Sequence, residues 1–362
     1  MEAHMQWNAK ANVVFAYRLP GEGWPAPEDF VRAARELMEA MRVRPDRPKI
    51  VIKPNVVVGV APDSGISVHP AFVAGLIDYF GSLGYGPERI AVGEGGSSEE
   101  DPDMRLHFGQ AGYEEYVASK GVRLVDLNAD SHVRVPIPEG IVFKEMPIAS
   151  TIKDPEAYFV DVAKLKSHNL AITTLTIKNL QGIVVPIGER HMCTPFPRYE
   201  GDRGGRGSEI SPDNKLDTHE RWANKILDIY LAAKPDLNLV EGIVGRDGTG
   251  FHRGDNLPTR TAIGGSNPVA VDTLASFIMG FDPAKLTYLR EAGKRSLGPN
   301  QVSELEIYEV TEGGRVKPCD DPEKLVSPRK FRVTLAQRWR YATLEDVEYT
   351  EAEPESFGRP GR

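Results

Sequence analysis

The chain has 362 residues, 40% of them hydrophobic and 27% charged, and a formal net charge of −8. These proportions are typical of globular proteins, and the length allows one large domain or two ordinary ones. The negative charge argues against nucleic acid or an anionic membrane as a partner, so an anion site must be a local positive pocket.

Processing and redox signals are few. Two cysteines, Cys193 and Cys319, cannot build a disulfide framework or ligate an iron–sulfur cluster, which needs about four protein ligands. The N-terminus lacks the pattern of a secretory signal, and no apolar run approaches the ~18 residues of a membrane span. A cytoplasmic, reduced protein is therefore expected.

Strand-like and helix-like segments alternate along the first part of the chain. Apolar and β-branched runs predict strands at 12–17, 49–58, 89–96 and 122–127, the second ending at Pro54. Helical spacing of apolar residues predicts helices at 27–41, 69–85 and about 103–119. This alternation indicates βαβ units and a mainly parallel, Rossmann-like α/β fold.

The pattern loosens between residues 128 and 160, where two short strands are predicted, and 194–215 reads as a functional or disordered loop. Strands are expected at 157–166, 236–243, 259–265 and 305–310, and helices at 217–233, 268–279 and 283–295. We divide the chain into a lobe 1–127, a second lobe 128–320 across a cleft, and a partly disordered extension 321–362. The basic, aromatic segment 329–341 is expected to be a packed terminal element rather than a nucleic-acid patch.

The segment 160–184 places cations in an otherwise apolar sequence. Lys164, Lys166 and His168 alternate along a predicted strand, so their side chains share one face at its carboxyl end. Ligands bind at that edge of parallel sheets. Two lysines on one face repel each other unless an anion or carboxylates lie between them, which indicates a binding site.

The next run, 171–178, is rich in β-branched residues, yet the spacing of Thr174 and Lys178 fits a helical face. Such a conflict between the conformational preference of the residues and their spacing is often found at functional sites. The alternative is that the threonines and Asn179 only satisfy the backbone, and that Lys178 extends to solvent.

Polar side chains also follow other strands. They are Lys53, Asn55, His69, Glu94, Arg190 and His191. His69 opens a predicted helix, whose N–H groups favour an anion. Glu94 fits a base, a metal ligand or the partner of a lysine, whereas no base or metal spacing marks Cys193.

A Gly-rich loop at 242–255 follows another strand. It carries Arg246, Asp247, His252, Arg253 and Asp255. Arginine binds carboxylate or phosphate with two parallel hydrogen bonds, and glycines let the backbone approach a ligand. A solvated surface loop is the alternative.

Asp272 falls on the apolar face of a predicted helix, so it needs a partner, and a lysine of the site would serve. The histidines have no HxxxH or HxH spacing, and the chain has no P-loop, GxSxG, CxxC or complete GxGxxG motif. A tight transition-metal site is not indicated. A weakly held Mg²⁺ ion stays an open possibility, with Glu94, Asp247, Asp255 or Asp272 as its ligands.

The segments KPN, HP, GEGG, KLKSHNLAITTLTIKNLQG, ERHM, EGIVGRDGTG and NPVAVDTLASFIMGFDP occur in this order. Over residues 49 to 299 the chain thereby resembles the family called "domain of unknown function 362". Many members of that family are described as iron–sulfur proteins because they carry a ferredoxin-like cysteine module. With two cysteines, this chain departs from them, and no iron–sulfur cluster is expected. A looser likeness to nickel-pincer lactate racemases is an analogy of layout only.

We therefore expect an enzyme that binds a small carboxylate or phosphorylated metabolite in a cationic cleft. The expected catalytic residues are Lys164, Lys166, His168, Lys178 and His191. The expected binding residues are Lys53, Asn55, His69, Asn179, Arg190, Arg246, His252 and Arg253. A desolvated lysine among cations acts as a base or as an imine-forming nucleophile, with histidine as its acid–base partner, in a lyase or isomerase.

Two alternatives stay open. One is Mg²⁺-dependent phosphoryl or diphosphate chemistry. The other is a non-catalytic protein, derived from an iron–sulfur family, that holds an anion or cofactor. A homodimer is compatible with either.

Overall fold

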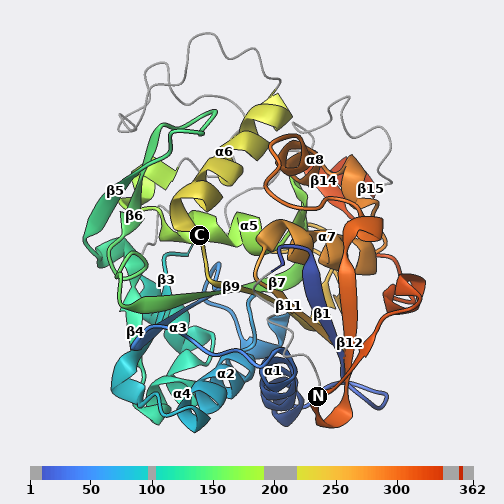
Figure 1. Ribbon diagram of the computed structural model, residues 1–362, viewed down its shortest axis with the longest axis horizontal. Helices are drawn as coiled ribbons and strands as arrows, with labels where there is room; N and C mark the ends of the chain where they lie inside the picture. Colours follow the sequence, from blue (N-terminus) through green and yellow to red (C-terminus); the bar gives the residue numbers. More distant parts are fainter. Residues whose placement is uncertain (1–9, 97–102, 191–217, 337–349, 354–362) are drawn as a thin grey trace.

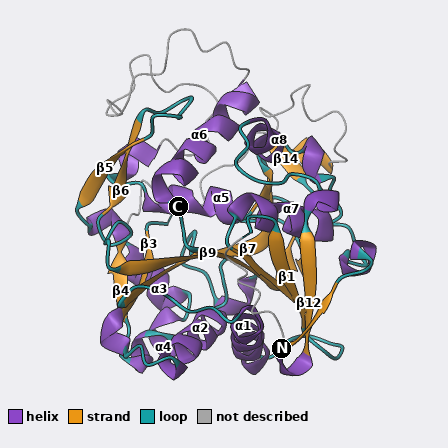
Figure 2. Cartoon of the chain, viewed as in Figure 1, coloured by secondary structure: helices purple, strands orange, loops and turns teal. Residues whose placement is uncertain are grey.

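The computed structural model describes residues 10–96, 103–190, 218–336 and 350–353. Within these ranges, eleven strands form one mixed sheet whose main order is β13-β12-β1-β11-β9-β7-β2-β3-β4. Seven strands run in one direction: β1 (Val13–Arg18), β2 (Lys49–Pro54), β3 (Ile90–Glu94), β4 (Arg123–Asp126), β7 (Ala157–His168), β9 (Leu237–Arg246) and β12 (Glu306–Thr311). Four run against them: β8 (Ile172–Thr174), β10 (Asn256–Leu257), β11 (Thr261–Gly265) and β13 (Arg315–Pro318). The predicted α/β fold with a mainly parallel sheet is confirmed (Figure 2).

Helices cover both faces of the sheet (Figure 1). One apolar core contains residues of α1 (Pro27–Met41), α2 (Pro70–Ser82), α3 (Met104–Gln110) and α4 (Tyr113–Tyr116). The opposite face is covered by α5 (Thr176–Asn179), α6 (Thr218–Ala233), α7 (Pro268–Ile278) and α8 (Thr287–Lys294). Because both faces are covered, the central strand β7 is buried along its whole length.

The predicted helix at 103–119 is interrupted. Gly112 has a φ of 76°, a left-handed conformation that ends α3 before α4 begins. A Cβ at Gly112 would also lie 2.9 Å from Pro62 Cγ. A single glycine therefore divides a segment whose apolar spacing is helical throughout.

Two small sheets complete the fold. In the region 128–160, where two short strands were predicted, β5 (His132–Pro136) and β6 (Glu145–Ala149) form an antiparallel pair. In the second small sheet, β14 (Thr334–Ala336) pairs with β15 (Thr350–Glu353). The predicted loop at 194–215, and most of the predicted disordered tail, lie outside the described residues. Among the residues that are described, no helix has the length and apolar character needed to cross a membrane.

One sheet contains strands from both predicted lobes. β2 pairs with β7, and the N-terminal strand β1 lies between β11 and β12. The lobe boundaries at residues 127 and 320 stay predictions.

Candidate functional site

The carboxyl ends of four neighbouring parallel strands, β9, β7, β2 and β3, meet at one edge of the sheet. Lys164, Lys166 and His168 lie on one face at the end of β7, and all three are buried. Lys53 at the end of β2 and Glu94 at the end of β3 are buried at the same edge. The structure thus gathers these predicted site residues inside the protein.

Lys53 has the surroundings of an ammonium group. Its Nζ donates to Glu94 Oε2 at 2.9 Å, to Asn179 Oδ1 at 3.0 Å and to the Pro54 carbonyl at 3.2 Å. Three acceptors match the three N–H donors of a protonated lysine, and one acceptor carries the compensating charge. Of the roles considered for Glu94, the structure therefore gives it that of a lysine partner.

The backbone holds Glu94 in place. Its Oε2 accepts from Val56 N at 2.9 Å, and its Oε1 accepts from Gly95 N at 2.7 Å. Gly182 packs directly against the ion pair, and a Cβ there would collide with Glu94 Oε1. A glycine is required at this close approach.

Lys164 is paired with Glu241, the first residue of the segment EGIVGRDGTG, which was not among the expected site residues. Lys164 Nζ donates to Glu241 Oε2 at 2.5 Å, and both side chains are buried. Burial lowers the pKa of Lys164, while the negative charge of Glu241 opposes that shift. The signal in the sequence was an acidic residue within an apolar strand, and only the register of the sheet places it opposite Lys164.

Lys166 differs from both of these lysines. Its Nζ donates to Asn55 Oδ1 at 2.7 Å and to the Ile66 carbonyl at 2.6 Å, and no carboxylate among the described residues bonds to it. Burial, together with the positive charges of Lys178 and Lys164, lowers the pKa of Lys166 well below its usual range. A neutral amine has two N–H donors, so these two acceptors suit the neutral form, whereas an ammonium has a third donor.

Two asparagines and an aspartate fix the orientation of these groups. Asn55 Nδ2 donates to Asn179 Oδ1 at 3.1 Å, and Asn179 Nδ2 donates to Asp161 Oδ1 at 2.7 Å. Burial raises the pKa of Asp161 well above its usual range, although the positive charge of Lys53 opposes this. Its Oδ2 has no hydrogen-bond partner among the described residues. Asp161 was missed in the sequence because it reads as a single polar residue in an apolar strand.

The His168 ring is held as one tautomer. Its Nδ1 accepts from Leu170 N at 3.0 Å and from Ala171 N at 3.2 Å, so the proton of the neutral ring is on Nε2. Burial, helped by the charges of Lys178 and Lys166, lowers the pKa of His168 well below its usual range. His168 is therefore suited to donate a hydrogen bond through Nε2 rather than to accept a proton.

His69 caps the helix that it opens. Its Nδ1 accepts from Ala71 N at 3.2 Å, and its ring stacks on Phe30 with 4.1 Å between the ring centroids. Burial, with the charge of Lys164, lowers the pKa of His69 to about 3. The helix terminus that we expected to favour an anion is thus capped by the histidine itself.

Only part of the β-branched run is helical. Thr174 lies in β8 and pairs with Lys166, so the predicted helical face joining Thr174 to Lys178 is wrong. Asp272 fixes the start of α5, because its Oδ1 accepts from Thr176 N at 2.8 Å and from Thr176 Oγ1 at 2.5 Å. Burial raises the pKa of Asp272 to about 7. The expected lysine partner of Asp272 is therefore replaced by Thr176.

Lys178 extends from α5 and is half-buried. No hydrogen bond or ion pair joins it to another residue in the described ranges. Its charge nevertheless acts on both Lys166 and His168. Lys178 is therefore a cation beside the buried amine that has no acidic partner among the described residues.

Arg190 is buried and faces the backbone. Its Nη1 donates to the carbonyls of Gly95 and Gly96, each at 2.9 Å, and its Nε to Val184 O at 3.1 Å. Its Nη2 donates to Asn128 Oδ1 at 2.8 Å. Arg190 thus clamps the turn after β3, a positional role that differs from the expected substrate contact. His191 and Cys193 lie outside the described residues.

The Gly-rich loop after β9 is tied to the C-terminal segment. Buried Asp247 accepts from Arg329 Nη2 at 3.0 Å and from Arg332 Nε at 2.8 Å, and Asp255 binds both arginines as well. The same segment touches the site, since Ser167 Oγ donates to Arg332 O at 2.8 Å. Of the predicted packed element 329–341, Phe331 and Val333 are buried, and residues 337–341 lie outside the described residues.

The remaining loop residues lie nearer the surface. Arg246 is half-buried and donates to Asn256 Oδ1 at 2.8 Å and to the Ser64 carbonyl at 3.2 Å. Its charge also helps to lower the pKa of Lys166, after burial and the two neighbouring lysines. His252 and Arg253 are exposed, which agrees with the alternative that part of this loop is a solvated surface loop.

The four candidate metal ligands are not brought together. Glu94 pairs with Lys53, Asp272 holds α5, and Asp247 and Asp255 bind arginines. Within the described ranges, no three His, Cys, Asp or Glu residues are grouped to hold a metal ion.

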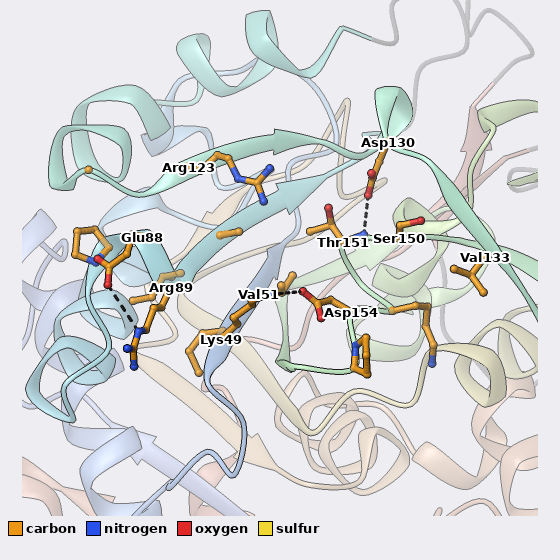
Figure 3. Close-up of a pocket in the computed structure, with 17 residues that line it drawn as sticks. Lys49, Val51, Glu88, Arg89, Arg123, Asp130, Val133, Ser150, Thr151 and Asp154 are labelled. Carbon is orange, nitrogen blue, oxygen red and sulfur yellow. Dashed lines mark hydrogen bonds and ion pairs between the residues drawn. The ribbon is translucent and has the colours of Figure 1, made fainter.

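A hollow of about 700 Å³ lies at the opposite, amino edge of β2, β3 and β4 (Figure 3). Its charged groups include salt bridges at the surface. Lys49 Nζ lies 3.0 Å from Asp154 Oδ2 and 2.7 Å from Glu156 Oε2, and Arg89 Nε lies 3.7 Å from Glu88 Oε1. Lys153, which also lines the hollow, is half-buried and donates to the Ala232 carbonyl at 3.1 Å.

Comparison with known proteins gives a family and one distant relative. A family model described as "Domain of unknown function (DUF362)" matches residues 50–276. The thylakoid-associated protein sll1697 of Synechocystis sp. (strain ATCC 27184 / PCC 6803 / Kazusa) is 20% identical over 251 residues, which are 69% of this chain and 69% of that protein.

Proposed function

Because this chain belongs to the DUF362 family, whose description names no activity, we propose from the site itself that it is an enzyme acting on a small anionic metabolite. The substrate is a carboxylate or a phosphorylated compound, and the reaction is a proton transfer or an elimination next to the anionic group. The observation that carries this proposal is Lys166, a buried lysine with only neutral acceptors among the described residues. A base in this state operates at neutral pH.

Charge balance explains why the ligand is an anion. Lys53 and Lys164 are each neutralised by a buried glutamate, whereas Lys166 and Lys178 have no acidic partner in the described ranges. An anion beside Lys178 supplies the missing negative charge. His168 then donates from Nε2 to the oxygen on which negative charge develops, and Lys166 takes or returns the proton.

Solvent exchange tests the proposal even while the substrate is unidentified. A library of small carboxylates and phosphorylated metabolites is incubated with the protein in D₂O, and deuterium incorporation or product formation is followed by NMR. Lys166→Arg keeps a long side chain with N–H donors but replaces the neutral base with a cation that cannot accept a proton, so we expect the rate to fall about 10²- to 10⁴-fold. Lys49→Arg at the amino edge is the matched control.

Three results would contradict the proposal or replace its chemistry. Unchanged rates in Lys166→Arg would remove Lys166 from the mechanism. A metabolite that binds tightly without exchange or turnover would favour the non-catalytic carrier. Activity abolished by EDTA and restored by Mg²⁺ would favour metal-dependent chemistry. The cytoplasmic location and the homodimer stay predictions from the sequence.

A further inference from the structure

We infer that Lys166 is a nucleophile that forms an imine, and that the substrate is therefore a small anion carrying an aldehyde or ketone group. This inference rests on the proposed function and names the substrate class of the same site.

The hydrogen bonds of Lys166 leave one tetrahedral direction unused. Asn55 Oδ1 and the Ile66 carbonyl accept its two N–H bonds, at 2.7 and 2.6 Å, and no third acceptor lies among the described residues. Lys53, at the end of the neighbouring strand, has three acceptors, and one of them is Glu94. The third direction at Lys166 therefore holds the lone pair, which is the nucleophilic electron pair of an amine.

That geometry is fixed by the neighbouring amides. Asn179 Oδ1 accepts from both Lys53 and Asn55, and Asn179 Nδ2 donates to Asp161. Asn55 must therefore present its Nδ2 to Asn179 and its oxygen to Lys166. A reversed Asn55 would place its Oδ1 against Asn179 Oδ1, two acceptors, so Asn55 keeps its oxygen toward Lys166.

The neighbouring charges favour a nucleophile. Lysines that form imines are activated by desolvation or by a nearby cation, and Lys166 has both, with Lys178, Lys164 and Arg246 as the cations and the charge of Glu94 opposing them. The Nε2–H of neutral His168 polarises a carbonyl without adding charge. Lys178 binds the carboxylate or phosphate of the same substrate.

The step balances without a further reactant. The lone pair on Nζ forms a C–N bond to the carbonyl carbon while the π electrons of the C=O bond move to oxygen. That oxygen takes one proton from the nitrogen, and the hydroxyl then leaves as water with the second. The resulting imine withdraws electrons from the adjacent C–H or C–C bond, which is the bond that a lyase or isomerase must weaken.

Reductive trapping tests the inference. The full chain is incubated at pH 7 with glyoxylate and cyanoborohydride, and labelled peptides are quantified by mass spectrometry. Because only the neutral amine reacts, we expect Lys166 to be labelled at least about tenfold faster than Lys49, whose pKa is raised by its hydrogen bonds to Glu156 and Asp154. Lys166→Arg should remove this fast label.

A second variant reports on the charge state. Asn55→Asp keeps the shape of the side chain but puts a carboxylate in contact with Lys166, which favours the ammonium. We expect its label at Lys166 to form at least about tenfold more slowly than in the native chain. Equal rates would overturn the neutral-amine assignment.

The failure of this inference is distinguishable from failure of the proposed function. If no adduct forms at Lys166, but glyoxylate without reductant still slows acetylation of Lys166 by acetic anhydride, the imine is excluded and the anion site survives. If glyoxylate neither labels nor protects Lys166, the inference and the anion site both fail.

Discussion

The two ends of strand β2 carry one lysine each, four residues apart, in opposite environments. Lys49 at the amino end is 45% exposed and shares its charge with Asp154 and Glu156 at the surface. Lys53 at the carboxyl end is buried and is neutralised by Glu94 at 2.9 Å. Water screens the first lysine, whereas only a fixed partner compensates the second.

The comparison extends along the carboxyl edge itself. Lys164, like Lys53, is a buried lysine with a fixed acidic partner, because Glu241 neutralises it inside the protein. Lys166 is also buried but differs from both, since its acceptors among the described residues are neutral. This difference in hydrogen-bond partners is the reason that the proposed chemistry is placed at Lys166 rather than at Lys53 or Lys164.

The largest expected effect comes from removing Lys53. Lys53→Met leaves Glu94 buried without its cation, so we expect the free energy of unfolding to fall by about 3–5 kcal/mol in urea titrations. Replacing both partners, in Lys53→Met with Glu94→Gln, removes the isolated charge and should recover much of that loss. A single variant as stable as the native chain would disprove the pairing.

An intermediate effect is expected from His69. Its folded-state pKa of about 3 lies below the ordinary value of 6.5, so protonation favours the unfolded chain. The stabilisation is complete above about pH 6.5 and is lost as the pH falls toward 3, by up to about 1.4 kcal/mol per pH unit.

His69→Asn isolates this contribution, because asparagine also caps helices but does not titrate. We expect its free energy of unfolding, measured with denaturant at pH 7, 6 and 5, to depend less on pH than that of the native chain. Identical slopes would show that His69 is not held in its neutral form.

The smallest effect is expected at the amino edge. Lys49→Met removes a lysine whose pairs with Asp154 and Glu156 are exposed and screened by water, so the urea midpoint should stay unchanged within error. A loss as large as that of Lys53→Met would erase the contrast between the two ends of β2.

Local periodicity predicted most of the secondary structure. Helices at 27–41 and 268–279 correspond to α1 and α7, because their apolar residues repeat at the spacing of one buried helix face. Two predictions of secondary structure were wrong, one because of a backbone conformation and one because of a strand pairing. Gly112 interrupts a helical segment, and Thr174 pairs with Lys166 in a strand although its spacing to Lys178 is helical.

The sequence by itself determined the α/β class and the shared face of Lys164, Lys166 and His168, because alternation along a strand is a local property. Only the tertiary structure decided which lysine has an acidic partner. The register of β7 against β9 places Glu241 beside Lys164, and the packing of β2 beside β3 places Glu94 against Lys53. Contacts between residues distant in the chain thus decide which partners each buried lysine has, and no spacing in the sequence encodes these contacts.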